Sequence, residues 1–312
     1  NGQITGTPNV NVTSNTTYNF TVTATDDENQ TNSRAFNLIV LRPVYIKEIG
    51  QSVKFGWNSN SQTLQRNLSG SHSTWTLSMW IKSNHDSAVG NTTVRYLMSG
   101  SGGGTMGVFN EVRDSYAADA RGCINTYGGT SNRGPGSEFR FMDDEWTHIV
   151  LTSNSLAAKL YVNGVEDSTY GGEDFDVALS GTLRLLNWTD DGYTCFSHLA
   201  EVHFISGTAY APSNFGQLYN DTWIPKEVTL TTANYGADGF HLDFADASDL
   251  GNDVSGNNND CTTNMDSSNG SYCKHDSPTK SAMQLQSYSG TASRYRNKWG
   301  SYLYSAYEQL YH

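Results

Sequence analysis

The sequence predicts an all-β protein, a sandwich of short antiparallel strands, from its composition and from one central hairpin. Only 16% of the residues are charged, and Gly (30), Tyr (18) and Trp (7) are plentiful, which suits short strands joined by many turns. Apolar and polar residues alternate from Trp146 to Leu151, the period of a strand between two packed layers. A second strand ends at Asn163-Gly164, a pair that tolerates the positive φ of a type I′ turn.

Residues 1–43 form the first predicted unit. Two alternating stretches, 18–26 and 34–41, flank a polar turn, and Pro43 ends the second stretch. The pair resembles the last two strands of an immunoglobulin-like repeat, which serves as a spacer in adhesins. Because 43 residues are too few for a complete sandwich, we expect the missing strands to come from upstream sequence or from another subunit. The chain is therefore expected to be a piece of a longer protein.

Residues 44–225 form the second predicted unit. A strand at 75–82 places four apolar residues on one face, and the central hairpin follows it. The motif Trp-x-His-x-Val followed by Leu-Tyr-Val-Asn-Gly resembles the central hairpin of laminin-G-like (concanavalin A-like) jelly-roll domains, which mostly bind glycans or proteins. In a later strand, 196–205, the alternation predicts that Ala200, Val202 and Phe204 face inward while Glu201 and His203 face outward as ordinary surface residues.

A longer series of motifs resembles a narrower family, the concanavalin A-like and tail-fibre structural proteins of phages that infect aquatic bacteria. The series runs from about residue 53 to 279 and includes Ala-Glu-Val-His-Phe-Ile-Ser-Gly-Thr-Ala and Gly-Phe-His-Leu-Asp-Phe. We expect residues 226–280 to be an Asx-rich extension that supplies a closing strand or begins a further β unit. Residues 281–312 form a tyrosine-rich tail that departs from this family and packs on its own domain or on another subunit.

Charge, hydropathy and motifs exclude several functions. The formal charge is −12 and the 19 basic residues are scattered, whereas nucleic-acid binding needs clustered Lys and Arg. No apolar run approaches the ~18 residues of a membrane span. Glycanases of this fold carry Glu-x-Asp-x-x-Glu on one strand, and the nearest match, at Asp174 and Asp176, lacks the third acid. His198 and His203 would point to opposite faces, which disfavours a shared metal. We therefore predict that the chain is not an enzyme.

Calcium is the cofactor that the loops favour, because hard cations select carboxylate and amide oxygens. One loop combines Asp190 and Asp191 with Trp188 and Tyr193, a combination suited to stacking on a sugar ring or to holding calcium; Trp188 could instead belong to the core. The other loop centres on Asp253, and its alternative interpretation is a chain of Asx turns.

Four cysteines, Cys123, Cys195, Cys261 and Cys273, have no CxxC spacing, so a zinc ribbon is not expected. Cys261 and Cys273 bracket a polar loop that a disulfide could close, and the alternative is four free or partly buried thiols.

The sequence thus predicts a non-enzymatic structural and adhesive protein at a virion surface or in the extracellular space. It would be a tail fibre, head fibre or capsid decoration of a phage that binds a cell-surface glycan or protein. Its further partners would be other virion subunits and copies of itself. The alternative is a secreted bacterial carbohydrate-binding module attached to a separate catalytic domain.

Overall fold

The computed structural model describes residues 16–40, 47–55, 62–83, 94–101, 105–109, 123–128, 132–140, 145–155, 157–167, 178–187, 197–219, 221–264, 272–273 and 277–279. The chain divides into two units, Asn1–Ile46 and Lys47–His312, so the boundary lies three residues beyond the predicted one. The tyrosine-rich tail lies outside the described residues. No helix in the described ranges is long and apolar enough to cross a membrane.

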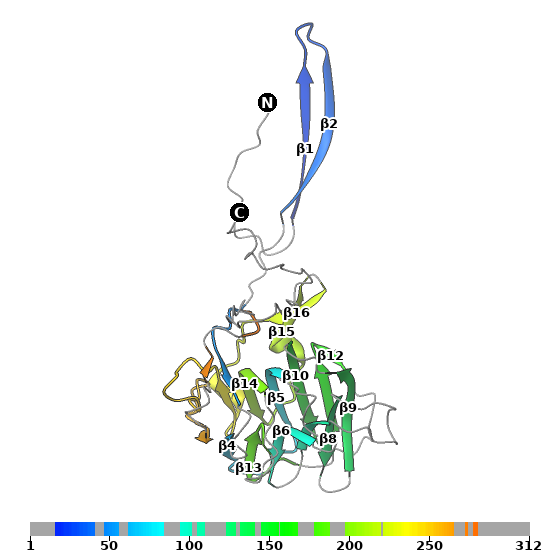
Figure 1. The fold of residues 1–312 in the computed structure, drawn as a ribbon. Coiled ribbons are helices and arrows are strands. Elements are labelled where there is room, and N and C mark those ends of the chain that lie inside the picture. The colour runs from blue at the N-terminus through cyan, green and yellow to red at the C-terminus, as the bar shows by residue number, and fades with distance from the viewer. Residues whose placement is uncertain are drawn as a thin grey trace, which may run out of the picture. The chain divides into compact units, whose positions relative to one another are not determined.

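The first unit is a β-hairpin of β1 (Thr16–Thr25) and β2 (Thr31–Val40), joined by an acidic turn (Figure 1). Asp26 closes that turn, because its carboxylate accepts hydrogen bonds from the backbone N–H groups of Glu28 (3.1 Å) and Gln30 (2.7 Å). The strands pair in register along their whole length, with Phe20 opposite Phe36. The two alternating stretches and the polar turn therefore form the predicted hairpin.

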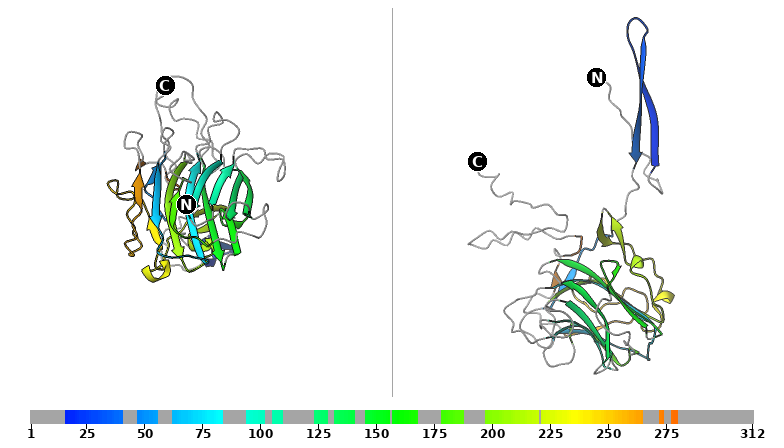
Figure 2. Two further views of the ribbon diagram at one scale, coloured as in Figure 1. Left: turned by 90° about the horizontal axis from the view of Figure 1, so that it is seen from below. Right: turned by 90° about the vertical axis from the view of Figure 1, so that its right-hand side faces the viewer.

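The second unit is an antiparallel sandwich of an eight-stranded and a seven-stranded sheet (Figures 1 and 2). The larger sheet has the order β12-β11-β10-β5-β14-β3-β19, with β17 also paired to β14. Its strands are β3 (Ser52–Lys54), β5 (Trp75–Ser83), β10 (Trp146–Asn154), β11 (Ala157–Val162), β12 (Val165–Glu166), β14 (Ser197–Ser206), β17 (Phe240–Leu242) and β19 (Tyr272–Cys273).

The smaller sheet has the order β18-β4-β13-β6-β7-β8-β9. Its strands are β4 (Thr63–Asn67), β6 (Val94–Gly100), β7 (Thr105–Phe109), β8 (Cys123–Gly128), β9 (Asn132–Arg140), β13 (Thr182–Leu185) and β18 (Thr262–Asn264). A separate hairpin of β15 (Gly216–Tyr219) and β16 (Thr222–Pro225) follows the short helical turn η1 (Pro212–Asn214) and precedes the one-turn helix α1 (Thr232–Tyr235).

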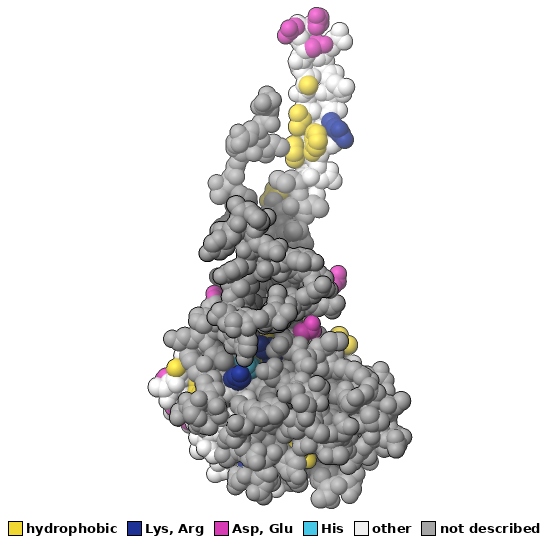
Figure 3. All heavy atoms as spheres, in the orientation of Figure 1, with side chains coloured by type: hydrophobic (Ala, Val, Ile, Leu, Met, Phe, Trp, Pro, Cys, Tyr) yellow, Lys and Arg dark blue, Asp and Glu magenta, His cyan; other side chains and the backbone are white. Residues whose placement is uncertain are grey.

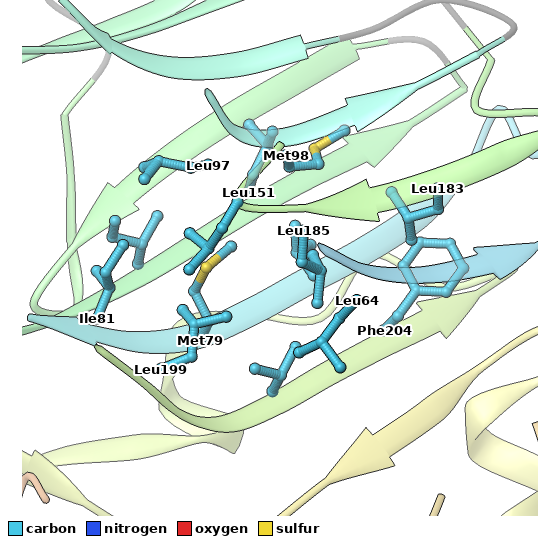
Figure 4. Packing of buried hydrophobic residues seen from close by; sticks show 14 of the residues in the cluster. Leu64, Met79, Ile81, Leu97, Met98, Leu151, Leu183, Leu185, Leu199 and Phe204 are labelled. Carbon is cyan, nitrogen blue, oxygen red and sulfur yellow. The ribbon is translucent and has the colours of Figure 1, made fainter. Parts of the chain in front are cut away.

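The main core lies between the two sheets (Figure 4). Leu77, Met79 and Ile81 of β5 point into it, as the alternation predicts, and so does Trp75, which is fully buried. The seven-stranded sheet contributes Leu64, Leu97, Met98, Leu183 and Leu185 from its facing side.

The outer face of the larger sheet carries a second apolar layer. Trp80, Trp146 and Ala200 pack there with Ile49 and the half-buried Trp223. Next to them Val150 and Ile205 pack against Phe215 and Tyr235, from the segment that follows β14. β10 is therefore a strand between two packed layers, as predicted, and residues between Tyr210 and Tyr235 supply much of the outer layer.

The Asx-rich extension belongs to this sandwich. β17 pairs with β14, β18 with β4 and β19 with β3, so the extension adds closing strands to both sheets. Of the two alternatives open from the sequence, the structure shows the closing strand.

One sequence expectation about β14 is wrong in part. A β-bulge interrupts its pairing with β5 between Ala200 and His203, and Glu201 has a positive φ of 47°. The extra residue shifts the alternation by one position, so Ala200 packs in the outer layer while Val202 and Phe204 point into the main core.

Candidate functional site

The loop with Trp188, Asp190, Asp191 and Tyr193 lies outside the described residues. The residue that precedes it is firmly anchored: the Asn187 side chain is 1% exposed, donates to the Gln62 carbonyl (3.3 Å), and its own carbonyl accepts the Ser99 hydroxyl (2.8 Å). The loop leaves the smaller sheet after β13 and enters the larger sheet at β14. Its calcium and glycan roles therefore remain predictions.

Asp253, the other calcium candidate, organises the loop around it. Its Oδ1 accepts the N–H groups of His241 (2.8 Å) and Ser255 (2.8 Å). Its Oδ2 accepts the Ser255 hydroxyl (2.9 Å) and the Asn259 N–H (2.9 Å). A carboxylate offers about four acceptor positions, and all four are used within the chain. The structure thus gives Asp253 the arrangement of the Asx-turn alternative, and calcium would have to displace these bonds.

The structure distinguishes between the two alternatives for Cys261. Cys261 is a free thiol, 6% exposed, and it packs against the main core. For Cys261 the structure therefore shows the free-thiol alternative and not the disulfide. Burial raises the pKa of the Cys261 thiol to about 12. Cys195 and the side chains of Cys123 and Cys273 lie outside the described atoms.

The structure brings together Glu201 and His203, which the alternation predicts to be surface residues, with His241, for which the sequence makes no prediction. Glu201 lies on the β14 bulge, His203 two residues on, and His241 directly opposite His203 on β17. Glu201 is 7% and His203 1% exposed. His241 Nε2 lies 2.9 Å and His203 Nε2 3.6 Å from Glu201 Oε2. The ordinary-surface interpretation is therefore wrong, because the segment that follows β14 covers this face of the sheet.

Two further groups complete this cluster. The Tyr235 hydroxyl lies 2.8 Å from His203 Nδ1, and Lys47 Nζ lies 3.6 Å from Glu201 Oε1. Burial alone would raise the pKa of Glu201, but the hydrogen bonds from His203 and His241 hold it well below its usual value. Burial lowers the pKa of His203 to about 4. Glu201 is thus an anion, and because an ionised carboxylate can only accept hydrogen bonds, His241 Nε2–H is the donor of the 2.9 Å bond between them.

The ligand atoms of Glu201, His203 and His241 lie within 4.8 Å of one another, so the three residues are a candidate metal site. However, the two imidazoles are stacked, with ring centroids 4.0 Å apart and planes 21° from parallel. Their in-plane lone pairs run side by side and do not converge on one point, which coordination by both rings requires. The arrangement is a hydrogen-bonded cluster, and metal binding would need at least one ring to rotate.

A third histidine on the same face, His148, is held in one tautomer by its hydrogen bonds. His148 Nε2 lies 2.9 Å from Ser78 Oγ, a spacing that suits a nucleophile and its base. However, the indole N–H of Trp223 donates to His148 Nδ1 (2.9 Å). Indole is a donor only, so His148 carries its proton on Nε2 and donates it to Ser78. His148 therefore cannot accept the Ser78 proton.

A small pocket lies between the Glu201–His203 cluster and the His148–Ser78 pair. Lys47, Ser78, His148, Glu201 and His203 line it, together with apolar residues of the outer layer. Its volume is about 10 Å³, which is roughly what one water molecule needs. The pocket therefore has room for water and not for a sugar ring.

The sequence carried one usable signal for this site, Glu-x-His on one predicted strand. The sequence could not show that His241 joins this site, since His241 is 38 positions away from His203 and pairs with it only through β17. The tight packing of Trp223 on glycines was also not foreseen: a Cβ on Gly164 or Gly216 would lie closer than 3.0 Å to the Trp223 ring.

Comparisons with known proteins agree with this architecture. Residues 55–207 match the model of the concanavalin A-like lectin/glucanases superfamily, just under half of the chain. No curated protein matches the sequence. A putative carbohydrate-binding protein from Bacteroides ovatus has 14% identity and a TM-score of 0.51, over 86% of this chain and 71% of that one.

Two other solved structures are similar over smaller parts of this chain. The SAP-like pentraxin of Limulus polyphemus has 14% identity and a TM-score of 0.39, over 52% of this chain and 78% of that one. Domain 4 of an extracellular arabinanase from Geobacillus stearothermophilus, solved with arabinotriose, has 18% identity and a TM-score of 0.32, over 46% of this chain and 66% of that one. The family match and the strand topology identify the folded core of this chain as a concanavalin A-like, laminin-G-like jelly-roll domain.

Proposed function

We propose that this chain is a non-enzymatic, glycan-binding structural component of a phage virion appendage: a tail fibre, a head fibre or a capsid decoration. The jelly roll would be the contact module and the N-terminal hairpin unit part of the spacer. Many weakly binding copies on one particle would raise avidity without any new contact. Residues 55–207 match a superfamily that includes both lectins and glucanases. The chemistry of the described residues therefore has to distinguish sugar binding from glycan hydrolysis.

The observation that carries the proposal is the covered outer face of the larger sheet. Trp80 and Trp146 are buried there, and the chain's own covering segment packs Phe215 on the same face, so this described face of the larger sheet is not open to a polysaccharide. Glu201, the acid of the cluster on this face, is held as an anion by its hydrogen bonds. Glu201 is an anion between two imidazoles, whereas glycoside hydrolysis needs one protonated and one ionised carboxyl group beside the scissile bond.

Binding would then take place at loops at the ends of the sandwich. The candidate loop remains Trp188–Tyr193, in which an aromatic ring could stack on the apolar face of a sugar while Asp190 and Asp191 bind its hydroxyls, directly or through calcium. The firm anchoring of Asn187 supports this choice, because a binding loop on a rigid base loses less entropy when it binds.

A glycan array with and without chelator tests the proposal, comparing the native chain with a double Asp190→Ala, Asp191→Ala variant. We expect binding that the double substitution weakens at least ~10-fold, and that chelator weakens if calcium takes part. A Glu201→Gln variant is the matched control, since Glu201 is buried and should leave binding unchanged. Absence of binding to every glycan would contradict the contact role, and release of reducing sugar from any bound glycan would contradict the non-enzymatic one.

The alternative, a secreted bacterial carbohydrate-binding module, shares the glycan site and differs in context. A specific antibody imaged on native phage particles by negative-stain electron microscopy would label an appendage if the virion proposal is correct. Labelling of a secreted hydrolase, with particles unlabelled, would favour the alternative.

A further inference from the structure

The hairpin β1–β2 has two unlike faces. Tyr18, Phe20 and Val22 alternate along β1 and share one face, and Phe36 lies directly opposite Phe20 on β2. The Phe20 and Phe36 rings stack with centroids 5.7 Å apart, and the Arg34 guanidinium lies 5.6 Å from the Phe36 centroid. On the other face, the residues whose side chains the structure describes are polar apart from Ala35; they include Thr17, Asn19, Thr21, Thr23, Ser33, Ala35 and Asn37.

The apolar face has no cover within the described part of the hairpin. Tyr18 is 49%, Val22 49% and Phe36 39% exposed, and Figure 3 shows these hydrophobic side chains gathered along the hairpin below its acidic tip. An isolated two-stranded hairpin is marginally stable in water unless a further layer packs on its apolar face. The face therefore needs an occupant.

We propose that the apolar face of β1–β2 packs against the same face of a second copy of this chain, with the two hairpins antiparallel. The proposal rests on the proposed function, in which one particle carries many copies of this chain. A two-fold contact requires a self-complementary patch, and the patch has this property. Rotation about an axis at Phe20 places the large Tyr18 ring of one copy over the small Val22 of the other. It also brings Arg34, which lies opposite Val22, over the Tyr18 ring as a cation–π partner.

Charge selects the antiparallel arrangement over the parallel one. Asp26, Asp27 and Glu28 lie together at the hairpin tip. Parallel packing would bring the two acidic tips side by side, and like charges in close contact are destabilising. Antiparallel packing about Phe20 separates the tips by roughly 40 Å, since each lies about six residues from the axis at ~3.4 Å per residue.

The size of the face indicates a weak, reversible contact. A ten-residue pair of strands presents roughly 34 Å by 10 Å, so two copies would bury about 700 Å² in total. A stable interface between two proteins usually buries ~1,200 Å² or more. The contact should therefore form at high local concentration, as on an appendage that carries several copies, and dissociate in dilute solution.

Sedimentation velocity of the whole chain tests the surface. We expect the weight-average sedimentation coefficient to rise between about 10 µM and 1 mM protein. Phe20→Ser with Phe36→Ser should abolish this rise, whereas Thr21→Ser with Ala35→Ser, the neighbouring register pair on the polar face, should leave it unchanged. A chain that stays monomeric throughout, or an association that the Phe double variant does not weaken, would overturn the proposal.

A photo-crosslinking experiment keeps the test valid if the Phe double variant unfolds the hairpin. Benzoylphenylalanine at Tyr18 should crosslink to peptides that contain Val22 or Arg34 of the second copy. Crosslinks from position 18 to position 18 would indicate parallel packing, and crosslinks only to the jelly roll would place the contact elsewhere; either result refutes the proposal. Glycan-array binding of the Phe double variant should be retained, so failure of this contact and failure of the proposed function give different results.

Discussion

Gly164 has a positive φ in a tight turn, and it also packs directly against the Trp223 ring. Gly164→Ala should therefore destabilise the jelly roll in two ways, through backbone strain and through a steric clash. Gly164 has φ +82°, and an added Cβ would overlap the six-membered ring of Trp223. The positive φ costs a residue with a Cβ about 1–2 kcal/mol. Overpacking costs a further ~1–3 kcal/mol, because Trp223 is held between Gly164 and Gly216 and hydrogen-bonded to His148. We expect a total of about 2–5 kcal/mol.

Gly207 supplies a matched control for this prediction. Its φ is +92°, and nothing lies within 4 Å of an added Cβ, so Gly207→Ala should cost only the backbone contribution of about 1–2 kcal/mol. In a Trp223→Ala background, Gly164→Ala should fall to that same cost, and the double-mutant cycle measures the coupling. All seven tryptophans lie beyond residue 46, so urea unfolding followed by Trp fluorescence reports on the jelly-roll unit. Equal costs for Gly164→Ala and Gly207→Ala, with no coupling, would show that Trp223 does not pack on this turn.

Three other predictions concern the two apolar layers and the buried cluster. Trp146→Ala should cost ~3–5 kcal/mol, because Trp146 is a large aromatic residue only 3% exposed; a cost below ~1 kcal/mol in urea unfolding would contradict its place in the outer layer. A chain that ends at Gly207, where the family match ends, should lose cooperative thermal unfolding in calorimetry, while a chain that ends at Thr279 should retain it. Stability should fall as the pH falls from about 6.5 toward 4, because the folded state holds His203 neutral with its pKa lowered to about 4 from 6.5 while the unfolded chain takes up the proton. His203→Gln should flatten that part of the stability–pH curve, and an unchanged slope would show that His203 does not cause it.

The fold was largely predictable from the sequence because local patterns determine it. Trp146 to Leu151 showed the alternation of a strand buried on both faces, and β10 is buried along all but its last residue. Asn163-Gly164 predicted a two-residue turn, and both residues have positive φ, 49° and 82°. These signals lie within a few residues of each other and need no knowledge of the rest of the chain.

The candidate site was not predictable in the same way, because it depends on pairings over long sequence distances. His241 reaches His203 only through the pairing of β17 with β14. Trp223 reaches His148 across 75 positions. A single sequence shows that these side chains can ionise or donate, but not that they meet or that one segment buries them together.

The bulge at Glu201 explains both the error in the predicted alternation and the existence of the cluster. Regular alternation through β14 would make Glu201 share the side of Leu199 and place its charge in the main core, where an unpaired carboxylate is very costly. The inserted residue instead places Glu201 at the outer layer, within reach of Lys47, His203 and His241, and returns Val202 to the core. The strain of a positive φ at a residue with a Cβ, roughly 1 kcal/mol, is small beside that burial cost. The same bulge thus lets one strand serve two apolar layers, and the buried anion helps to fasten the covering segment to the sheet.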